Sequence, residues 1–74
     1  MEYNASAFLE RLKDLMNDKD LNQSSLARST GIPRRSIVNW FHGTLNPSLE
    51  YLVALATVFN CSVDYLIGRA GYES

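Results

Sequence analysis

The sequence predicts an all-α fold in which five short helices form one small bundle. Apolar residues recur every three to four positions, as on one side of a helix, and no stretch alternates apolar and polar residues as a strand does. Gly, Pro and Asn divide the chain between these stretches. The 74 residues, 46% apolar and 20% charged, are too few for two domains and too apolar for a disordered chain. We therefore expect a single domain over 1–74, with a helical core at about 4–68 and a tail or the start of a linker at 69–74.

The first expected helix runs from Asn4 or Ser6 to Asp18 and has one apolar face. That face consists of Phe8, Leu9, Leu12, Leu15 and Met16. Asn22 can cap the start of a short second helix, and Gly31 can end it in the left-handed conformation. The residues expected to face inward from the second helix are Leu26 and Ala27.

The third expected helix spans about 33–42, from Pro33 to His42, and stops at Gly43. Proline favours a helix start because its fixed φ fits there and its missing N–H costs no hydrogen bond. The residues expected to face inward from this helix are Ile37, Trp40 and Phe41.

The last two expected helices have favourable residues at both ends. The fourth follows Asn46-Pro47-Ser48 and ends at Asn60, which can adopt the left-handed conformation. Its expected core face consists of Leu49, Leu52, Leu55, Ala56 and Phe59. Ser62 can cap the fifth helix, which we expect to comprise Val63 to Ile67, with Asp64 near its positive end and Gly68 after it.

Several classes of protein are excluded or disfavoured by single residues and missing motifs. The only cysteine, Cys61, cannot form an intrachain disulfide and is expected to be a buried apolar filler, and the only histidine, His42, cannot complete a Cys/His zinc site. We expect no metal and no other cofactor. The longest apolar stretch has nine residues, 51–59, whereas a bilayer needs about 20, and no basic signal segment is present. We expect a cytoplasmic protein with no membrane partner and, for want of any catalytic motif, no enzyme.

Charge is distributed unevenly along the chain. The net charge of −1 and the isoelectric point of about 5.6 argue weakly against nucleic-acid binding. Between Leu21 and Leu49, however, there is no acidic residue, and Arg28, Arg34 and Arg35 supply three positive charges. A local basic surface is typical of nucleic-acid-binding proteins, although solvated surfaces also carry arginine.

The segment 23–40 has the pattern of two helices that cross steeply through a short turn. Such a crossing needs a small residue, here Ala27, a glycine in the turn, here Gly31, and apolar residues between the helices. The apolar positions are Leu26, Ile32, Ile37 and Trp40. The pattern extends over four stretches of the sequence, which are L-N-Q-S-S-L-A-R-S-T-G-I, R-R-S-I-V-N-W-F-H-G, N-P-S-L-E-Y-L and C-S-V-D-Y-L-I-G. From Leu12 to Gly68 the chain resembles the Cro/phage-repressor family (lambda repressor-like, Xre-type) of helix-turn-helix DNA-binding proteins.

The resemblance implies a transcriptional regulator, in particular a repressor, that binds double-stranded DNA with the third helix in the major groove. Base contacts would come from Arg34, Arg35, Ser36 and Asn39. Contacts with the DNA backbone would come from Gln23, Arg28, His42 and Thr44. All of these could instead be ordinary surface residues, and Gln23 could cap its own helix. Two adjacent arginines at a helix start, where the dipole disfavours cations, favour a functional explanation.

The chain departs from the family at two places. Many members pair Arg with Glu across the first and third helices, at positions where this chain has Met16 and Phe41. Replacement of a buried ion pair by packed apolar side chains is often neutral or stabilising, so we expect Met16 and Phe41 to be in contact. Asp20 stands where glycine is common, and it tolerates the left-handed backbone better than most residues.

A homodimer is expected, because one such domain contacts too few base pairs to select a single site. Apolar residues left outside the expected core are candidates for the dimer surface, and these are Tyr51, Val58, Tyr65 and Ile67, with Ala54 and Thr57 beside them. The same residues could contact a second domain or be scattered on the surface. Two other functions stay open: a protein-interaction module with the same fold, and an antitoxin or restriction-control regulator.

Overall fold

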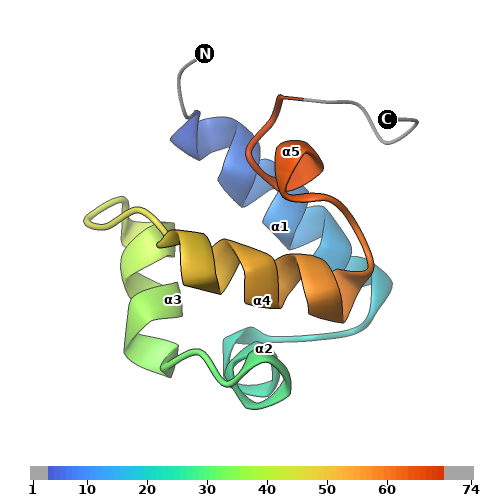
Figure 1. Cartoon of the computed structure of the whole chain (residues 1–74). Coiled ribbons are helices and arrows are strands. Elements are labelled where there is room, and N and C mark those ends of the chain that lie inside the picture. The colour runs from blue at the N-terminus through green and yellow to red at the C-terminus, as the bar shows by residue number, and fades with distance from the viewer. Residues whose placement is uncertain (1–3, 70–74) are drawn as a thin grey trace.

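All regular elements among residues 4–69, the part that this computed structural model describes, are α-helices (Figure 1). They are α1 (Ala5–Asp18), α2 (Gln23–Thr30), α3 (Arg34–His42), α4 (Leu49–Phe59) and α5 (Val63–Leu66). The predicted all-α class and the order of the five helices are confirmed. Two boundaries differ by one residue, because Pro33 is the N-cap of α3 and Ile67 is the C-cap of α5.

Side-chain caps define the starts of α1, α2, α4 and α5. The most complete is at α2, where the Asn22 side chain accepts a hydrogen bond from the Ser25 N–H and the Ser25 hydroxyl accepts one from the Asn22 N–H, both at 2.8 Å. Asn4, Ser48 and Ser62 each accept a single bond from the backbone three residues on. Since loss of such a cap costs about 1 kcal/mol, these residues determine where the helices begin.

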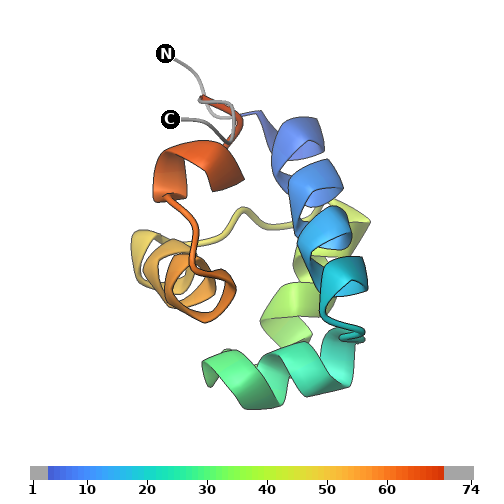
Figure 2. The same ribbon diagram turned by 90° about the vertical axis from the view of Figure 1, so that its right-hand side faces the viewer.

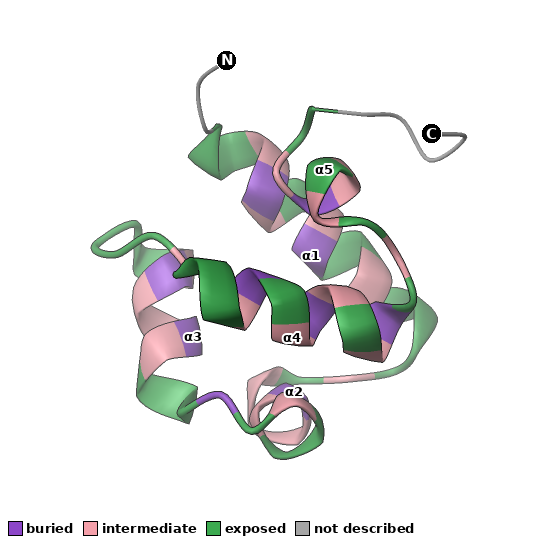
Figure 3. Ribbon diagram, viewed as in Figure 1, coloured by how far each residue is buried: buried purple, intermediate pink, exposed green. Residues whose placement is uncertain are grey.

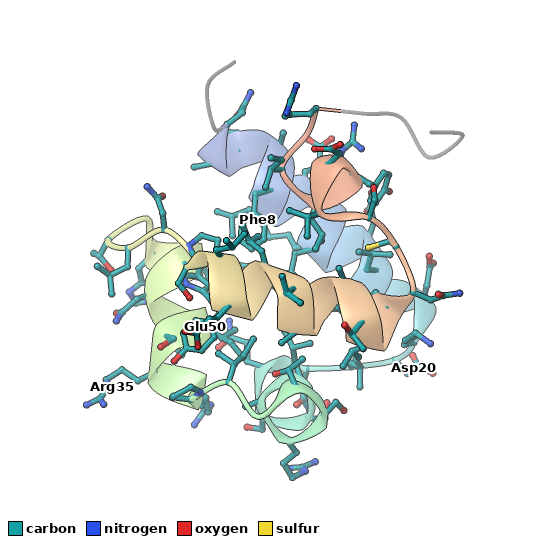
Figure 4. The ribbon with its side chains drawn as sticks, in the orientation of Figure 1. Phe8, Asp20, Arg35 and Glu50 are labelled. Atoms are coloured by element: carbon teal, nitrogen blue, oxygen red, sulfur yellow. The ribbon has the colours of Figure 1, made fainter. Side chains whose placement is uncertain are left out.

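Left-handed residues end three of the helices and turn the chain after α1. Gly31 and Gly43 both have φ of 77°, at the ends of α2 and α3, and Asn60 ends α4 with φ of 54°. Asp20, in the turn after α1, has φ of 56° (Figure 4). The predicted left-handed positions are therefore confirmed.

The helices enclose one apolar core (Figures 2 and 3). In Figure 2, α1 and α4 stand on opposite sides of the core, with α2 across one end and α5 across the other. Contacts join α2 to α3 and α4, and α5 to α1 and α4. The buried side chains are Phe8, Leu12, Met16, Leu26, Ile32, Ile37, Trp40, Leu52, Leu55, Phe59 and Leu66 (Figure 3). No polar or charged residue in the described part of the chain is buried.

An aromatic group holds α3 against its neighbours. The Trp40 ring of α3 meets Phe8 of α1 edge to face, with centroids 5.7 Å apart, and Tyr51 of α4 at a tilt, with centroids 6.1 Å apart. Figure 4 shows Phe8 directed into the space between α1 and α4. The rotation of α3 about its axis is thereby fixed, which determines the side that it presents outward.

The C-terminal end of the described chain is fastened to α1. Arg11 Nη1 donates a hydrogen bond to the Tyr65 carbonyl oxygen at 3.1 Å, and its guanidinium carbon lies 4.4 Å from the centroid of the Tyr65 ring. Gly68, with φ of 83°, passes so close to α1 that a Cβ there would lie 2.7 Å from the Cβ of Ala7. The segment after α5 is therefore held beside the first half of α1.

Two predictions about burial need correction. The prediction that Leu49 belongs to the core is wrong, because this residue is 71% exposed. It is the first residue of α4 and lies one turn before Leu52, the first α4 residue that is buried. Cys61 is only partly buried, against the edge of the core, and this burial raises the pKa of its thiol. Within residues 4–69, no helix is long and apolar enough to cross a membrane.

Candidate nucleic-acid interface

The turn between α2 and α3 is fastened by apolar packing and by hydrogen bonds. The Thr30 hydroxyl donates to the Leu26 carbonyl oxygen at 2.8 Å and accepts from the Ile32 N–H at 3.2 Å. Gly31 supplies the left-handed conformation, and Ile32 is buried directly after it. The angle between α2 and α3 is thereby fixed, so that α3 projects from the domain as one rigid element.

The outward side of α3 carries the predicted base-contacting residues. Arg34 and Arg35 occupy its first turn and are exposed, and Figure 4 shows the Arg35 side chain extending away from the ribbon. Neither arginine forms an ion pair with another residue of the stretch 4–69. Ile37 and Trp40 are buried on the inner side of the helix. By helical spacing Arg35 lies opposite these two residues and Arg34 at the edge between the two sides, so α3 is anchored on one side and leaves both guanidinium groups exposed.

The other two predicted base-contacting residues lie on the same helix but are less exposed. Ser36 and Asn39 are half-buried. The Asn39 carbonyl oxygen accepts bonds from both the N–H and the hydroxyl of Thr44, at 3.0 and 3.2 Å. The Asn39 amide group is not used by these bonds and is able both to donate and to accept.

Thr44, a predicted contact with the DNA backbone, is exposed just after α3, and its N–H and hydroxyl both donate to the Asn39 carbonyl oxygen. These bonds close the C-terminal end of α3. The contact of Thr44 with DNA stays a prediction. His42, the last residue of α3, is exposed beside it and is the other predicted phosphate contact at this end.

At the start of α2, Gln23 is the first helical residue and is half-buried. Asn22, not Gln23, caps the helix, which leaves the Gln23 amide without the capping role. Gln23 borders a shallow hollow of about 410 Å³ between α1, α2 and α3, and the lining residues are Lys13, Met16, Asn17, Leu21, Asn22, Gln23 and Phe41. Arg28 is exposed in the last turn of the same helix.

Met16 and Phe41, the positions where many members of the family pair Arg with Glu, lie on the same hollow. Met16 is buried and Phe41 is half-buried, and both line it. One contact there was not predicted from the sequence. The Lys13 ammonium nitrogen lies 5.7 Å from the centroid of the Phe41 ring. The two residues are far apart in the chain, and only the crossing of α1 and α3 brings them together.

The predicted dimer residues are mostly engaged within the domain. Tyr51, Val58, Tyr65 and Ile67 are all half-buried, with Tyr51 packed on Trp40 and Tyr65 bound by Arg11. The large apolar side chains that are most exposed in the described chain are Leu45 at 57%, Leu49 at 71% and Val53 at 51%. We call these three residues the exposed apolar patch. Helical periodicity missed it because it assigned Leu49 to the core.

Metal-binding side chains do not gather in the described part of the chain. No group of three or more His, Cys, Asp or Glu residues comes together between residues 4 and 69.

Comparison with known proteins agrees with this geometry. A family model described as helix-turn-helix matches residues 12–66. The chain is 33% identical over 61 residues to the uncharacterized HTH-type transcriptional regulator YobD of Bacillus subtilis, covering 82% of this chain and 54% of the relative. It is 28% identical over 60 residues to the cryptic phage CTXphi transcriptional repressor RstR of Vibrio cholerae, covering 81% of this chain and 54% of the repressor.

A shorter relative is covered more fully. An uncharacterized HTH-type transcriptional regulator of Archaeoglobus fulgidus is 33% identical over 54 residues, which is 73% of this chain and 76% of the relative. The chain spans about half the length of the bacterial and phage relatives described above. No solved structure matches the chain at a comparable level.

Proposed function

The chain belongs to the helix-turn-helix family, of the Cro/phage-repressor type, and from that premise we propose that it is a transcriptional repressor that binds specific sequences in double-stranded DNA. In this proposal α3 enters the major groove, and α2 lies across the sugar–phosphate backbone. The observation that carries the proposal is the pair of exposed arginines, Arg34 and Arg35, free of ion pairs within residues 4–69, on a helix whose other side is buried.

The side chains on α3 match the chemistry of base edges. A guanidinium group donates two parallel hydrogen bonds, which fits the O6 and N7 acceptors of guanine, and this suits Arg34 and Arg35. An amide donates and accepts at once, which fits the N6 and N7 of adenine, and this suits Asn39. Gln23 and His42 flank α3 in this proposal and contact phosphates, which sets the register of the helix in the groove.

A selection from random duplexes, followed by salt titration, tests the proposal. We expect enrichment of one sequence, and an affinity that falls steeply with salt, because each phosphate that the protein neutralises contributes about −0.9 to the slope of log K against log salt concentration. Failure to enrich any sequence, together with an affinity that barely changes with salt, would contradict DNA recognition. That result would favour the protein-interaction module, whose apolar contact is insensitive to salt.

We further propose that two copies bind one site as a homodimer and that they meet at the exposed apolar patch. Leu45 follows Thr44 closely after the end of α3, so the patch begins, along the chain, next to the proposed DNA interface. In this proposal the two-fold axis brings both copies of α3 to the same side of the pair, as successive half-sites roughly 34 Å apart require. The net charge of −1 gives little repulsion between two copies.

Substitution within the patch tests the dimer. The double variant Leu49→Ser, Val53→Ser is expected to sediment as a monomer at concentrations where the natural chain forms dimers. It should also bind a palindromic site more weakly, because the two copies no longer pair. The variant should stay folded, because both side chains are at least half exposed and contribute little to the folded monomer. Glu10→Ser, an exposed position on α1, is the matched control and should leave the sedimentation unchanged. Equal sedimentation of all three proteins would exclude the patch as the interface.

A further inference from the structure

We propose that Lys13 of α1 binds a phosphodiester group of the DNA, and that the Phe41 ring of α3 positions its ammonium group for this contact. The inference rests on the proposed function and adds a residue to it. Lys13 lies outside the helix-turn-helix unit of α2 and α3, on a flank of the chain that is acidic overall. Lys13 is among neither the predicted base contacts nor the predicted backbone contacts.

Lys13 lies near the proposed phosphate contact of α2. Lys13 and Gln23 line the same hollow, and Gln23 is the proposed phosphate contact at the start of α2. Of the described residues that line this hollow, Lys13 alone carries a charge. The other polar groups there are the amides of Asn17, Asn22 and Gln23, and the remaining surface is apolar. A phosphodiester beside Gln23 would therefore meet one ammonium group and no carboxylate of the hollow.

The ammonium group of Lys13 is attracted by the ring of Phe41. The Lys13 nitrogen lies 5.7 Å from the centroid of Phe41, within the distance of about 6 Å at which an aromatic ring attracts a cation. Phe41 follows Trp40, which is buried, so its ring is held by the seating of α3. The contact directs a flexible side chain toward the α3 side of α1. Part of the conformational freedom that the Lys13 side chain would lose on binding a phosphate is therefore already lost in the free protein.

Competing partners of Lys13 lie on its other side. Glu10 and Asp14 share with Lys13 a second hollow, along the outer face of α1. Among residues 4–69, neither carboxylate forms an ion pair with Lys13. An acidic residue at position 41 would neutralise the ammonium group, whereas a ring attracts the cation and leaves its charge in place. Phe41 thus holds the ammonium group near the hollow while the charge remains available to an anion.

Salt titration of a charge-neutral variant tests the proposal. For Lys13→Gln, bound to the duplex selected by the natural chain, the slope of log K against log salt concentration should decrease in magnitude by about 0.9, because one phosphate is no longer neutralised. Affinity should fall by a similar factor on selected and random duplexes, because phosphates carry no sequence information. Lys19→Gln, an exposed lysine at the end of the same helix, is the matched control and should leave the slope unchanged.

A double-mutant cycle tests the role of the ring. Phe41→Leu keeps an apolar side chain but removes the aromatic face, so it should weaken DNA binding less than Lys13→Gln does. Lys13→Gln should then lower the affinity by a smaller factor in the Phe41→Leu background than in the natural chain. A purely structural role of Phe41 would leave the two effects independent. Thermal unfolding of each variant, followed by circular dichroism, verifies that the proteins compared are folded.

The outcomes separate this inference from the proposed function. If the natural chain binds no DNA, both fail. If it binds with a steep salt dependence and Lys13→Gln keeps the full slope, only the role of Lys13 is overturned. If Lys13→Gln lowers the slope but the effects of the two substitutions are independent, the positioning role of Phe41 is overturned. Addition of inorganic phosphate at constant ionic strength should not compete with DNA. Competition would identify a free-anion site instead of a duplex contact.

Discussion

Ile37→Ala is expected to unfold a large part of the protein at physiological temperature. Ile37 is fully buried in the middle of α3, and a truncation of this kind costs about 2–5 kcal/mol through lost burial and the cavity that remains. The core of a domain shorter than about 70–80 residues rarely supplies more than about 3–5 kcal/mol in total. The loss is thus comparable to the whole free energy of unfolding.

Urea denaturation followed by far-ultraviolet circular dichroism measures this loss. Thr57→Ala is the matched control, because Thr57 is also β-branched and helical but is exposed, and it should change the free energy of unfolding by less than about 0.5 kcal/mol. A similar small change for both variants would show that Ile37 is not a core residue. DNA binding by Ile37→Ala should fall with the folded fraction, without any change in the preferred sequence.

Loss of either arginine at the start of α3 should remove specific binding selectively. Arg34→Ala or Arg35→Ala is expected to weaken binding to the selected duplex by about 1–3 kcal/mol where the side chain makes a bidentate contact with guanine. Binding to random duplexes should change much less. The effect is measured as the ratio of dissociation constants for the two duplexes at one salt concentration, because a shared loss would cancel in that ratio.

Lysine at the same positions distinguishes a base contact from a phosphate contact. Arg35→Lys keeps the charge but loses the planar fork of donors, so it should keep the salt slope and lose most of the sequence preference. Retention of the full preference by the lysine variant would mean that Arg35 acts only as a charge. Both arginines are exposed, so these variants should unfold at the same urea concentration as the natural chain.

The positions of the helices could be predicted because their boundaries depend on neighbouring residues. Asn22, Gly31 and Asn60 cap or end helices through bonds and backbone conformations within a few residues, and all three behave as expected. The outward placement of Arg34 and Arg35 follows from the same local pattern, since Ile37 and Trp40 determine which side of α3 is buried.

The features that could not be predicted from the sequence depend on contacts between helices or on the path of a loop. The spacing of Leu49 is that of a core residue, but periodicity does not show that the core ends one turn before it. The contact of Lys13 with Phe41 requires the crossing of α1 and α3. The engagement of both Thr44 donors requires the path of the chain after Gly43. In each case a long-range or loop geometry determined what the local pattern left open.

The attachment of the segment after α5 to α1 determines where a label can be placed on the molecule. Because the Arg11 contact with Tyr65 and the close approach of Gly68 to Ala7 hold this segment beside the start of α1, its exit lies at the end of the domain away from α2 (Figure 2). A dye or a biotin group attached at position 69, which is exposed, would be carried on the side remote from that helix. Immobilisation through such a label should leave the proposed DNA-contacting surface accessible to duplexes passing over a sensor chip.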